Sequence, residues 1–333
     1  MTIAAVNYSA STSASSKQCH LLPMVHIFSM IAVNLLSTVI GTVGNVLVIS
    51  TVSKNVSLQT ISNFWLVSMA VADLFVTALG HPLLSVFLGL QMRGDCHETV
   101  SQAFRLIANL SCSASILHLC FISMDRCLVI LRPYDFRKIR TKKRFKIALA
   151  ISWTLPAVYG GLRLTVSKTA TSYFTVVAVG LCYIAIIICY FLIVLKVTEH
   201  GSAMLKRFPS QTGKRGVSKY LIERRVTVTI AIVVVIFTIC WFPLLYLRSA
   251  FAEENFGMLY NWARTLALTN SCINPWIYCF RITAFRESYK RLLRCQLKSV
   301  CSRKDERRQR EANTGQLQSS ESETAYEGAE AAV

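Results

Sequence analysis

The chain contains seven long apolar runs, and no other feature limits its fold as strongly. They lie near residues 24–52, 61–90, 98–131, 145–162, 173–197, 222–250 and 258–281. Each holds roughly 18 residues or more, the length of helix needed to cross about 30 Å of hydrocarbon. The runs therefore predict an all-α membrane protein built as a bundle of seven transmembrane helices.

Composition and charge agree with a membrane location. Of the 333 residues, 53% are hydrophobic and only 16% are charged, and the mean hydropathy is +0.45. The net charge of +19 arises mainly in alternate connections, residues 132–146 and 206–225, and in the tail from Arg286. The positive-inside rule places these segments in the cytoplasm and the N-terminus outside. We interpret the basic excess as a topology signal and as contact with membrane lipids, not with nucleic acid.

Residues 1–23 are expected to form an extracellular N-terminal segment without a cleavable signal peptide, because residues 1–20 are polar. Asn7 begins an Asn-Tyr-Ser triplet and is a predicted glycosylation acceptor. Of the 12 cysteines, only Cys19 and Cys96 fall outside the cell, where disulfides persist. A disulfide between them and two free thiols remain open alternatives.

Polar side chains interrupt nearly every apolar run, and each is a candidate functional residue because such groups are costly inside a membrane. His118, alone in its run, is interpreted as a hydrogen-bonded core residue, since no nucleophile or metal-ligand pattern accompanies it. The others are Gly44-Asn45 in the first run, Asp73 in the second, Ser115 in the third, Cys240–Pro243 in the sixth and NSCINPWIYCF (Asn270–Phe280) in the seventh.

In order and spacing these residues resemble the signature of rhodopsin-like (class A) G protein-coupled receptors, over about residues 30–295. The matching segments are Gly44-Asn45, Asp73, Asp125-Arg126-Cys127, Trp153, Tyr190, FTICWFP (Phe237–Pro243) and NPWIY (Asn274–Tyr278). Weaker similarity extends to adenosine, melanocortin and melatonin-type receptors, and RITAFRESYKRLL is similar to adenosine receptors. The resemblance implies a non-enzymatic plasma-membrane receptor that transmits binding of an extracellular ligand to a heterotrimeric G protein.

The resemblance also implies an allosteric sodium site and no other cofactor. In the family, the matching positions line a water-filled pocket that holds the ion in the inactive state. A carboxylate with hydroxyl and amide oxygens is the ligand set that a hard cation prefers. The alternative is that these groups hold only water and join the helices. The residues are Asp73, Ser115, Asn270, Ser271 and Asn274.

For the coupling end, the resemblance implies a latch between Arg126, which follows Asp125, and Glu223 at the start of the sixth run. Such a pair would hold two helices together until activation frees the arginine for the G protein. A proline-weakened hinge below the ligand and two tyrosines joined through water would complete the switch. These residues are Tyr190, Phe237, Trp241, Pro243, Asn274, Pro275 and Tyr278.

The expected ligand pocket departs from the family pattern. Residues 163–172 lack the usual loop cysteine, as in melanocortin, cannabinoid and lysophospholipid receptors, and Ala108 stands where monoamine receptors carry an aspartate. Three arginines in the outer third of the bundle favour an anionic small molecule, lipid or peptide. Alternatively, they reach water or headgroups, or pair with nearby glutamates. The expected ligand-contact residues are Arg105, Ala108, Asn109, Trp241, Leu244, Leu245, Arg248, Arg264 and Leu268.

Beyond the expected bundle, residues 24–283, residues 284–296 have the pattern of a short amphipathic helix on the membrane surface. Cys295 is a candidate palmitoylation site, with a free thiol as the alternative. Residues 297–333 are predicted to be a disordered cytoplasmic tail. Its SSESET segment, Ser319–Thr324, resembles receptor-kinase substrates whose phosphates would recruit arrestin. A plain solubilising tail is the alternative.

Three other functions compete with this interpretation. A receptor for a nucleoside or an amine-like ligand is the first. An ion-coupled membrane transporter is the second, but such folds carry internal repeats, and none is evident. A light-sensing opsin needs a lysine in the seventh run, and residues 258–281 contain none.

Overall fold

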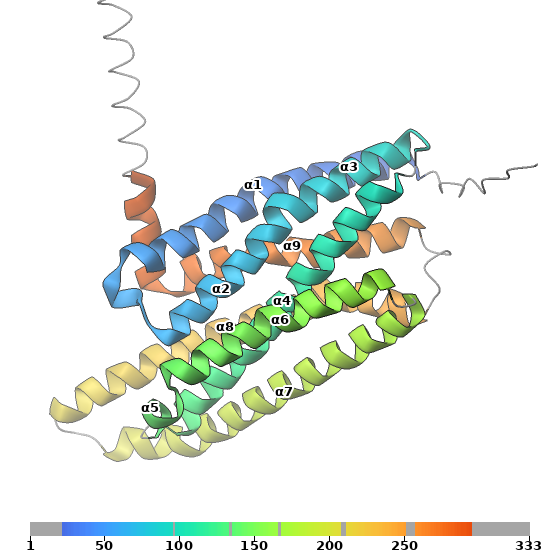
Figure 1. Ribbon diagram of the computed structural model, residues 1–333. Helices are drawn as coiled ribbons and strands as arrows, with labels where there is room; N and C mark the ends of the chain where they lie inside the picture. Colours follow the sequence, from blue (N-terminus) through green and yellow to red (C-terminus); the bar gives the residue numbers. More distant parts are fainter. Residues whose placement is uncertain are drawn as a thin grey trace, which may run out of the picture.

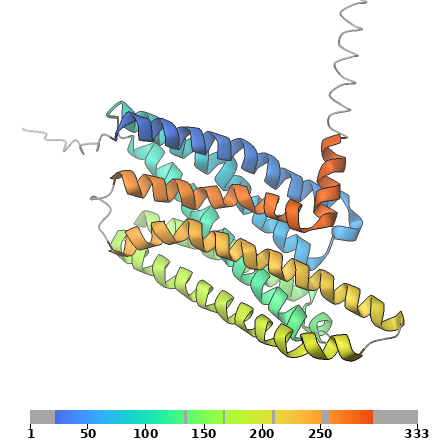
Figure 2. The same cartoon turned by 180° about the vertical axis from the view of Figure 1, so that it is seen from behind.

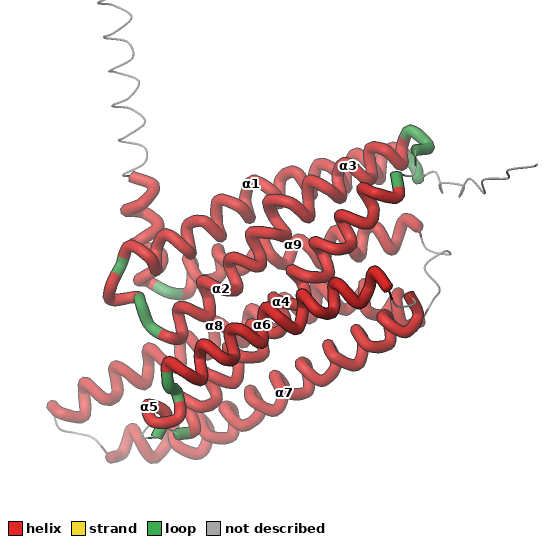
Figure 3. Tube along the Cα trace, in the orientation of Figure 1, coloured by secondary structure: helices red, strands yellow, loops and turns green. Residues whose placement is uncertain are grey.

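The structure is a computed structural model that describes residues 22–95, 97–132, 135–165, 168–207, 211–250 and 257–294. Within these ranges the backbone alone is described for residues 136–137, 163–165, 168–172, 197–207, 211–224, 248 and 250. The described residues form helices joined by short turns and contain no strand (Figure 3). This confirms the all-α fold class.

Seven membrane-spanning segments make up the bundle (Figure 1). The second is interrupted by η2, one turn of π-helix. In chain order the spans are α1 (Met24–Lys54), α2 (Ile61–Phe75) with η2 (Val76–Gly80) and α3 (His81–Met92), α4 (Glu98–Leu131), α6 (Lys142–Thr165), α7 (Lys168–Arg207), α8 (Gln211–Ala250) and α9 (Gly257–Arg281). The connections add η1 (Val56–Leu58) and α5 (Phe136–Ile139), and residues 283–294 are also helical.

Among the described residues, six of these spans are long and apolar enough to cross a membrane by length and composition alone. The seventh, α9, is more polar, but it lies inside the bundle between α1 and α8 (Figure 2). Its polar side chains face protein, because Asn261, Thr265, Asn270, Ser271 and Asn274 are all buried. A span that hides its polar groups among other helices tolerates a lower hydropathy.

Local sequence explains where the second span begins and bends. The Thr60 hydroxyl accepts a hydrogen bond from the Asn63 backbone N–H and caps the start of α2. Farther along, Pro82 has no N–H and its ring crowds the preceding helical turn. The π-helical turn η2 ends just before it, at Gly80. The insertion of this wider turn redirects α3 relative to α2.

Two glycines let α1 approach its neighbours closely. A Cβ atom on Gly41 would lie 2.7 Å from the Cys272 Cβ of α9, and one on Gly44 would lie 2.9 Å from the Pro275 Cβ. Real side chains do not fit at such distances. The contact between α1 and α9 therefore requires glycine at both positions, and it carries the polar residues of α9 into the core.

The two ends of the bundle are named here by residues that lie at them. The Met24 end holds the start of α1, the turn between α3 and α4, and the start of α9 (Figure 1). The Arg126 end holds the start of α2, the end of α4, and α5. Helix α4 packs against α2, α6 and α7 and connects the two ends through the centre of the bundle.

Candidate functional site

A cluster of polar side chains surrounds Asp73 at the centre of the bundle. Asp73 is fully buried, and its Oδ1 accepts hydrogen bonds from the hydroxyls of Ser115 (2.9 Å) and Ser271 (2.8 Å). The other carboxylate oxygen, Oδ2, accepts one from the Asn274 amide nitrogen (2.8 Å). The structure thus brings together residues of α2, α4 and α9 that the sequence placed in one site.

Three buried amide oxygens in the same region could act as ligands of a cation. Within the described part of the chain, the Oδ1 atoms of Asn45, Asn270 and Asn274 have no hydrogen-bond partner. The Asn45 side chain donates instead to the Gly41 and Ser271 carbonyls, at 2.9 and 3.1 Å. A buried carboxylate, two hydroxyl oxygens and nearby unsatisfied amide oxygens fit a monovalent cation such as sodium.

The same donor set does not fit a transition metal. Among the described residues, no group of three or more His, Cys, Asp or Glu side chains is placed to hold one. The sequence pattern identified Asn45 as a signature residue but did not connect it with Asp73. Its signal was an amide in an otherwise apolar run, and its contact with the Ser271 carbonyl became visible only in the structure.

At the Arg126 end, one carboxylate is shared by two arginines. Arg126 Nη2 donates to Asp125 Oδ2 at 2.6 Å, and Arg140 Nη1 lies 3.3 Å from Asp125 Oδ1. Ser62 joins them: its hydroxyl donates to Asp125 (2.9 Å) and accepts from both guanidinium groups. The side chains of Arg126 and Asp125 are only 5% and 7% exposed, so their charges are satisfied by one another and not by water.

The sequence missed two members of this Arg126 cluster, which consists of Ser62, Asp125, Arg126 and Arg140. Arg140 was counted only within a basic connection, and Ser62 carried no signal at all, since serine is common at helix starts. The expected partner Glu223 has only its backbone described, so the Arg126–Glu223 latch lies outside the described side chains and stays a prediction.

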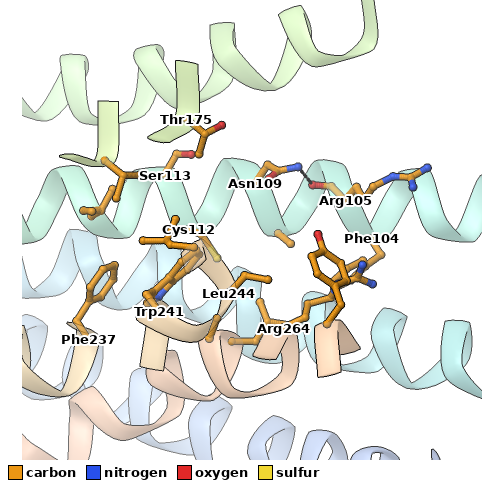
Figure 4. A pocket seen from close by; sticks show the side chains of 17 residues that line it. Phe104, Arg105, Asn109, Cys112, Ser113, Thr175, Phe237, Trp241, Leu244 and Arg264 are labelled. Carbon is orange, nitrogen blue, oxygen red and sulfur yellow. Dashed lines mark hydrogen bonds between the residues drawn. The ribbon is translucent and has the colours of Figure 1, made fainter. Parts of the chain in front are cut away.

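A cavity opens toward the Met24 end between α4, α7, α8 and α9 (Figure 4). Trp241 and Phe237 lie at one end of the view, stacked with ring centroids 5.5 Å apart, and Phe104 and Arg105 lie at the other. Eight of the nine expected ligand-contact residues line it, and the side chain of the ninth, Arg248, is outside the description. Those eight are Arg105, Ala108, Asn109, Trp241, Leu244, Leu245, Arg264 and Leu268.

The two described arginines of this cavity are held differently. The Arg264 guanidinium carbon lies 4.7, 5.2 and 6.0 Å from the ring centroids of Tyr260, Phe104 and Phe87, an arrangement that favours a cation. Arg105 forms an ion pair of 2.8 Å with Glu98, which lies about two turns earlier on the same face of α4, and 39% of the Arg105 side chain is exposed. Sequence reasoning missed this aromatic cage, because single aromatic residues in apolar runs are usually core residues.

The cavity measures about 90 Å³, less than the several hundred typical of a site enclosing a drug-sized ligand. A ligand larger than a few heavy atoms must therefore move the lining apart. The lining includes Trp241, two residues before Pro243 inside α8. Because proline removes a helical hydrogen bond at this point, α8 is the lining helix that can bend to enlarge the cavity.

The remaining switch residues occupy the helices between the two ends. Tyr278 is 2% exposed, and its hydroxyl donates to the Met69 sulfur at 3.9 Å. Tyr190, on α7, is partly buried, and no direct hydrogen bond joins it to Tyr278 among the described contacts. Asn274 and Pro275 lie in α9, where Asn274 binds Asp73.

His118 forms a separate network that ties α4 to α2 and α6. Its Nε2 lies 2.7 Å from the Ser68 hydroxyl and 3.1 Å from the Ser152 hydroxyl, and its Nδ1 lies 2.7 Å from the Ala114 carbonyl. The Trp153 indole N–H also donates to Ser68 (3.0 Å). These contacts satisfy both ring nitrogens, as expected for a structural histidine.

Of the other predicted sites, the glycosylation acceptor Asn7, the cysteines Cys19 and Cys96, and the palmitoylation candidate Cys295 lie outside the described residues. Residues 283–294 are helical, where a surface helix is expected over residues 284–296, and the place of this helix on the membrane surface stays a prediction. Its Phe285 and Tyr289 are 1% and 2% exposed, while Arg286, Arg291 and Leu293 are exposed, so one face packs against the bundle.

Comparison with known proteins identifies the family. The family model described as "7 transmembrane receptor (rhodopsin family)" matches residues 44–278, and the chain belongs to this family. It is therefore a multi-pass membrane protein of the rhodopsin-like receptor class. The structure is similar to that of squid rhodopsin, with a TM-score of 0.72 and 20% identity, over 83% of this chain and 88% of that one. At that identity the likeness shows the fold alone.

Curated relatives include receptors for several kinds of ligand. The chain is 28% identical to the alpha-1D adrenergic receptor of Rattus norvegicus (76% of this chain, 55% of that protein). It is 26% identical to melatonin receptor type 1C of Xenopus laevis (85% and 70%) and 27% identical to adenosine receptor A2a of Homo sapiens (82% and 74%). The chain spans about half the length of the alpha-1D adrenergic relatives that it matches.

Proposed function

We propose that this protein is a non-enzymatic plasma-membrane receptor that transmits binding of an extracellular ligand to a heterotrimeric G protein. The observation that carries the proposal is the arrangement of three sites along one bundle. A lined cavity lies toward the Met24 end, the Asp73 cluster lies at the centre, and the buried Arg126 cluster lies at the opposite end. Family membership supports the same reading.

The proposed orientation puts the Met24 end outside the cell. The basic connections, residues 132–146 and 206–225, then face the cytoplasm, as the positive-inside rule requires. In this orientation the cavity is open to extracellular ligands, and the Arg126 cluster meets the G protein. The tail from residue 297 follows on the cytoplasmic side, where phosphorylation of Ser319, Ser320, Ser322 or Thr324 by receptor kinases would create an arrestin-binding segment.

The Asp73 cluster is proposed to hold a sodium ion in the inactive state. The residues that would bind it are Asp73, Ser115, Asn270, Ser271 and Asn274, and the ion would balance the buried carboxylate. The chain's own residues link α2, α4 and α9 through this carboxylate. Any movement of α9 relative to α4 must therefore break hydrogen bonds to Asp73, which stabilise the resting arrangement.

The ligand class proposed is a small anionic molecule that carries a carboxylate or phosphate. Arg264 and Arg105 supply cationic donors at the mouth, and Arg264 is oriented by its aromatic cage. Adenosine and adrenergic relatives make a nucleoside or an amine the second candidate. Against an amine stands the lining itself, because Ala108 offers no charge to an ammonium group.

The test is G protein nucleotide exchange in membranes from cells expressing the receptor, screened against acids, phosphates, nucleosides and amines. We expect an acid or phosphate to stimulate exchange, and Arg264→Ala to shift its half-maximal concentration upward by about tenfold or more. Arg93→Gln, an exposed arginine in the turn after α3, serves as the matched control. An amine or nucleoside agonist with equal potency on Arg264→Ala would overturn the ligand class while leaving the receptor proposal standing.

A further inference from the structure

A second cavity of about 510 Å³ lies on the flank of the bundle, near the Arg126 end. It is bounded by α2, α4, α5 and the start of α6, with one residue contributed by α7. It is separate from the cavity toward the Met24 end, and the two share no lining residue. It shares Asp125 and Arg140 with the Arg126 cluster, but neither ligand binding nor G protein coupling, as proposed above, uses its other lining residues.

The wall of this flank cavity is apolar and lies within the spanning part of α2 and α4. Trp65 forms its floor, stacked on Phe121 with centroids 5.3 Å apart and edge-on to Phe145 at 4.9 Å. Met124 lines it too, and this side chain is 49% exposed although α4 is otherwise a central helix. An apolar hollow of this kind in a membrane span is filled by hydrocarbon more favourably than by water.

The rim of the same cavity is basic. Arg132, at the end of α4, and Arg140 and Arg144, from the α5–α6 segment, all line it. Arg144 donates one bond to the Ile139 carbonyl (3.1 Å), which fixes its position, and a guanidinium carries five N–H donors in all. Among the described lining residues Asp125 alone is acidic, and it already binds Arg126 and Arg140.

We propose that the flank cavity binds one anionic phospholipid of the surrounding leaflet, with its phosphate between Arg132 and Arg144 and an acyl chain against Trp65, Met124 and Phe145. A phosphodiester accepts the bidentate hydrogen bonds that guanidinium groups offer. A soluble anion would leave the apolar wall in contact with water, and a neutral lipid would bring no net charge to the arginines. An anionic lipid places its acyl chain against the apolar wall and its phosphate between the arginines.

The site has a direct connection to the Arg126 cluster. Arg140 lines the flank cavity and also binds Asp125 and Ser62. A phosphate in the cavity competes with Asp125 for this guanidinium. A bound lipid is therefore expected to weaken the contact between Arg140 and Asp125. This effect does not depend on a ligand in the cavity toward the Met24 end.

The test uses the full-length protein in nanodiscs of neutral phosphatidylcholine that contain a small, equal fraction of lipid brominated in the acyl chain. Bromine quenches nearby indole fluorescence, so the difference in quenching between wild type and Trp65→Phe reports lipid at this wall. We expect this difference to be severalfold larger with brominated phosphatidylglycerol than with brominated phosphatidylcholine. Glycerol phosphate in solution should not reduce it.

The double variant Arg132→Gln/Arg144→Gln should remove the preference for phosphatidylglycerol. Its control is Arg291→Gln/Arg294→Gln, which removes two exposed arginines from the C-terminal helix and should keep the preference. Equal quenching by both lipids, or an unchanged preference in the Arg132/Arg144 variant, would overturn the proposal. Displacement by glycerol phosphate would overturn it in favour of a soluble anion site.

A second measurement is independent of Trp65. Native mass spectrometry counts the phosphatidylglycerol molecules retained by the purified protein in detergent. We expect wild type and the Arg291/Arg294 control to retain one molecule more than the Arg132/Arg144 variant. Equal retention by all three proteins would contradict the site. Neither readout requires signalling, so failure here and failure of the receptor proposal are distinguishable.

Discussion

Paired charged side chains are buried at one end of the bundle and exposed at the other. At the Arg126 end, Asp125 and Arg126 are 7% and 5% exposed and hold each other. Toward the Met24 end, Arg105 is 39% exposed beside a glutamate that is 56% exposed, and Arg264 lies over aromatic rings. Separating the partners of a buried ion pair costs a large free energy, whereas separating the partners of an exposed pair costs little. The Arg126 end is thus suited to stabilise one conformation, and the Met24 end is suited to bind a ligand.

The largest expected effect comes from removing the carboxylate shared at the Arg126 end. Asp125→Ala deprives the buried Arg126 and the partly buried Arg140 of their common acceptor and should lower the free energy of unfolding by about 3 kcal/mol or more. Unfolding in mixed detergent micelles measures it. A loss below about 1 kcal/mol would show that water or other groups satisfy Arg126, and the contrast between the two ends would fail.

The central Asp73 cluster is expected to give the next largest effect. If sodium binds there, sodium chloride should stabilise the wild type by about 1.4 kcal/mol relative to choline chloride, when sodium is present at about ten times its Kd. Asp73→Asn keeps the shape of the side chain but removes its charge, so this difference should vanish. Equal sodium dependence of stability in both proteins would mean that the ion binds elsewhere. If neither protein is stabilised by sodium, the Asp73 cluster holds only water.

A smaller effect is expected from Ser62→Ala, which removes a hydroxyl that bonds to Asp125, Arg126 and Arg140. The charge pairs stay in place, so we expect a loss of about 1 kcal/mol in the free energy of unfolding. Ser29→Ala, which removes an exposed hydroxyl bonded only to its own helix, is the matched control. Equal small changes in the two variants would mean that Ser62 is incidental to the cluster.

The smallest effect is expected at the Met24 end, from the exposed pair of Glu98 and Arg105. Glu98→Gln removes the partner of Arg105, but both side chains are well exposed, so the free energy of unfolding should change by less than about 1 kcal/mol. The same variant frees Arg105 for a ligand and should leave anionic agonists equally potent or more potent. A marked destabilisation would show that the exposed pair is structural.

Much of the fold followed from the sequence, because its two strongest signals are simple. Long apolar runs specify spanning helices, and polar residues inside them must meet other polar residues. The resemblance to rhodopsin-like receptors grouped Asp73 with Ser115, Asn270, Ser271 and Asn274, and hydrogen bonds join Asp73 to Ser115, Ser271 and Asn274. Their spacing along the helices reflects a need that hydrocarbon imposes on any such chain.

The sequence was silent where a role depends on geometry between helices. Ser62 and Arg140 join the Arg126 cluster through contacts across 63 and 15 residues, which no local pattern reports. The cage around Arg264 combines Phe87, Phe104 and Tyr260 from separate helices. The flank cavity is likewise a gap between elements, and its lining residues read individually as ordinary core or basic-loop residues.

In the proposed receptor, ligand binding in the cavity toward the Met24 end is coupled to G protein binding at the Arg126 cluster. The most direct measurement is the affinity of an agonist from the proposed screen, with and without nucleotide-free G protein. Linkage requires that coupling raise the affinity of each partner by the same factor. We predict an increase of about tenfold or more for wild type and none for Arg126→Ala. An unchanged agonist affinity in wild type, with the G protein bound, would show that the two sites are not coupled.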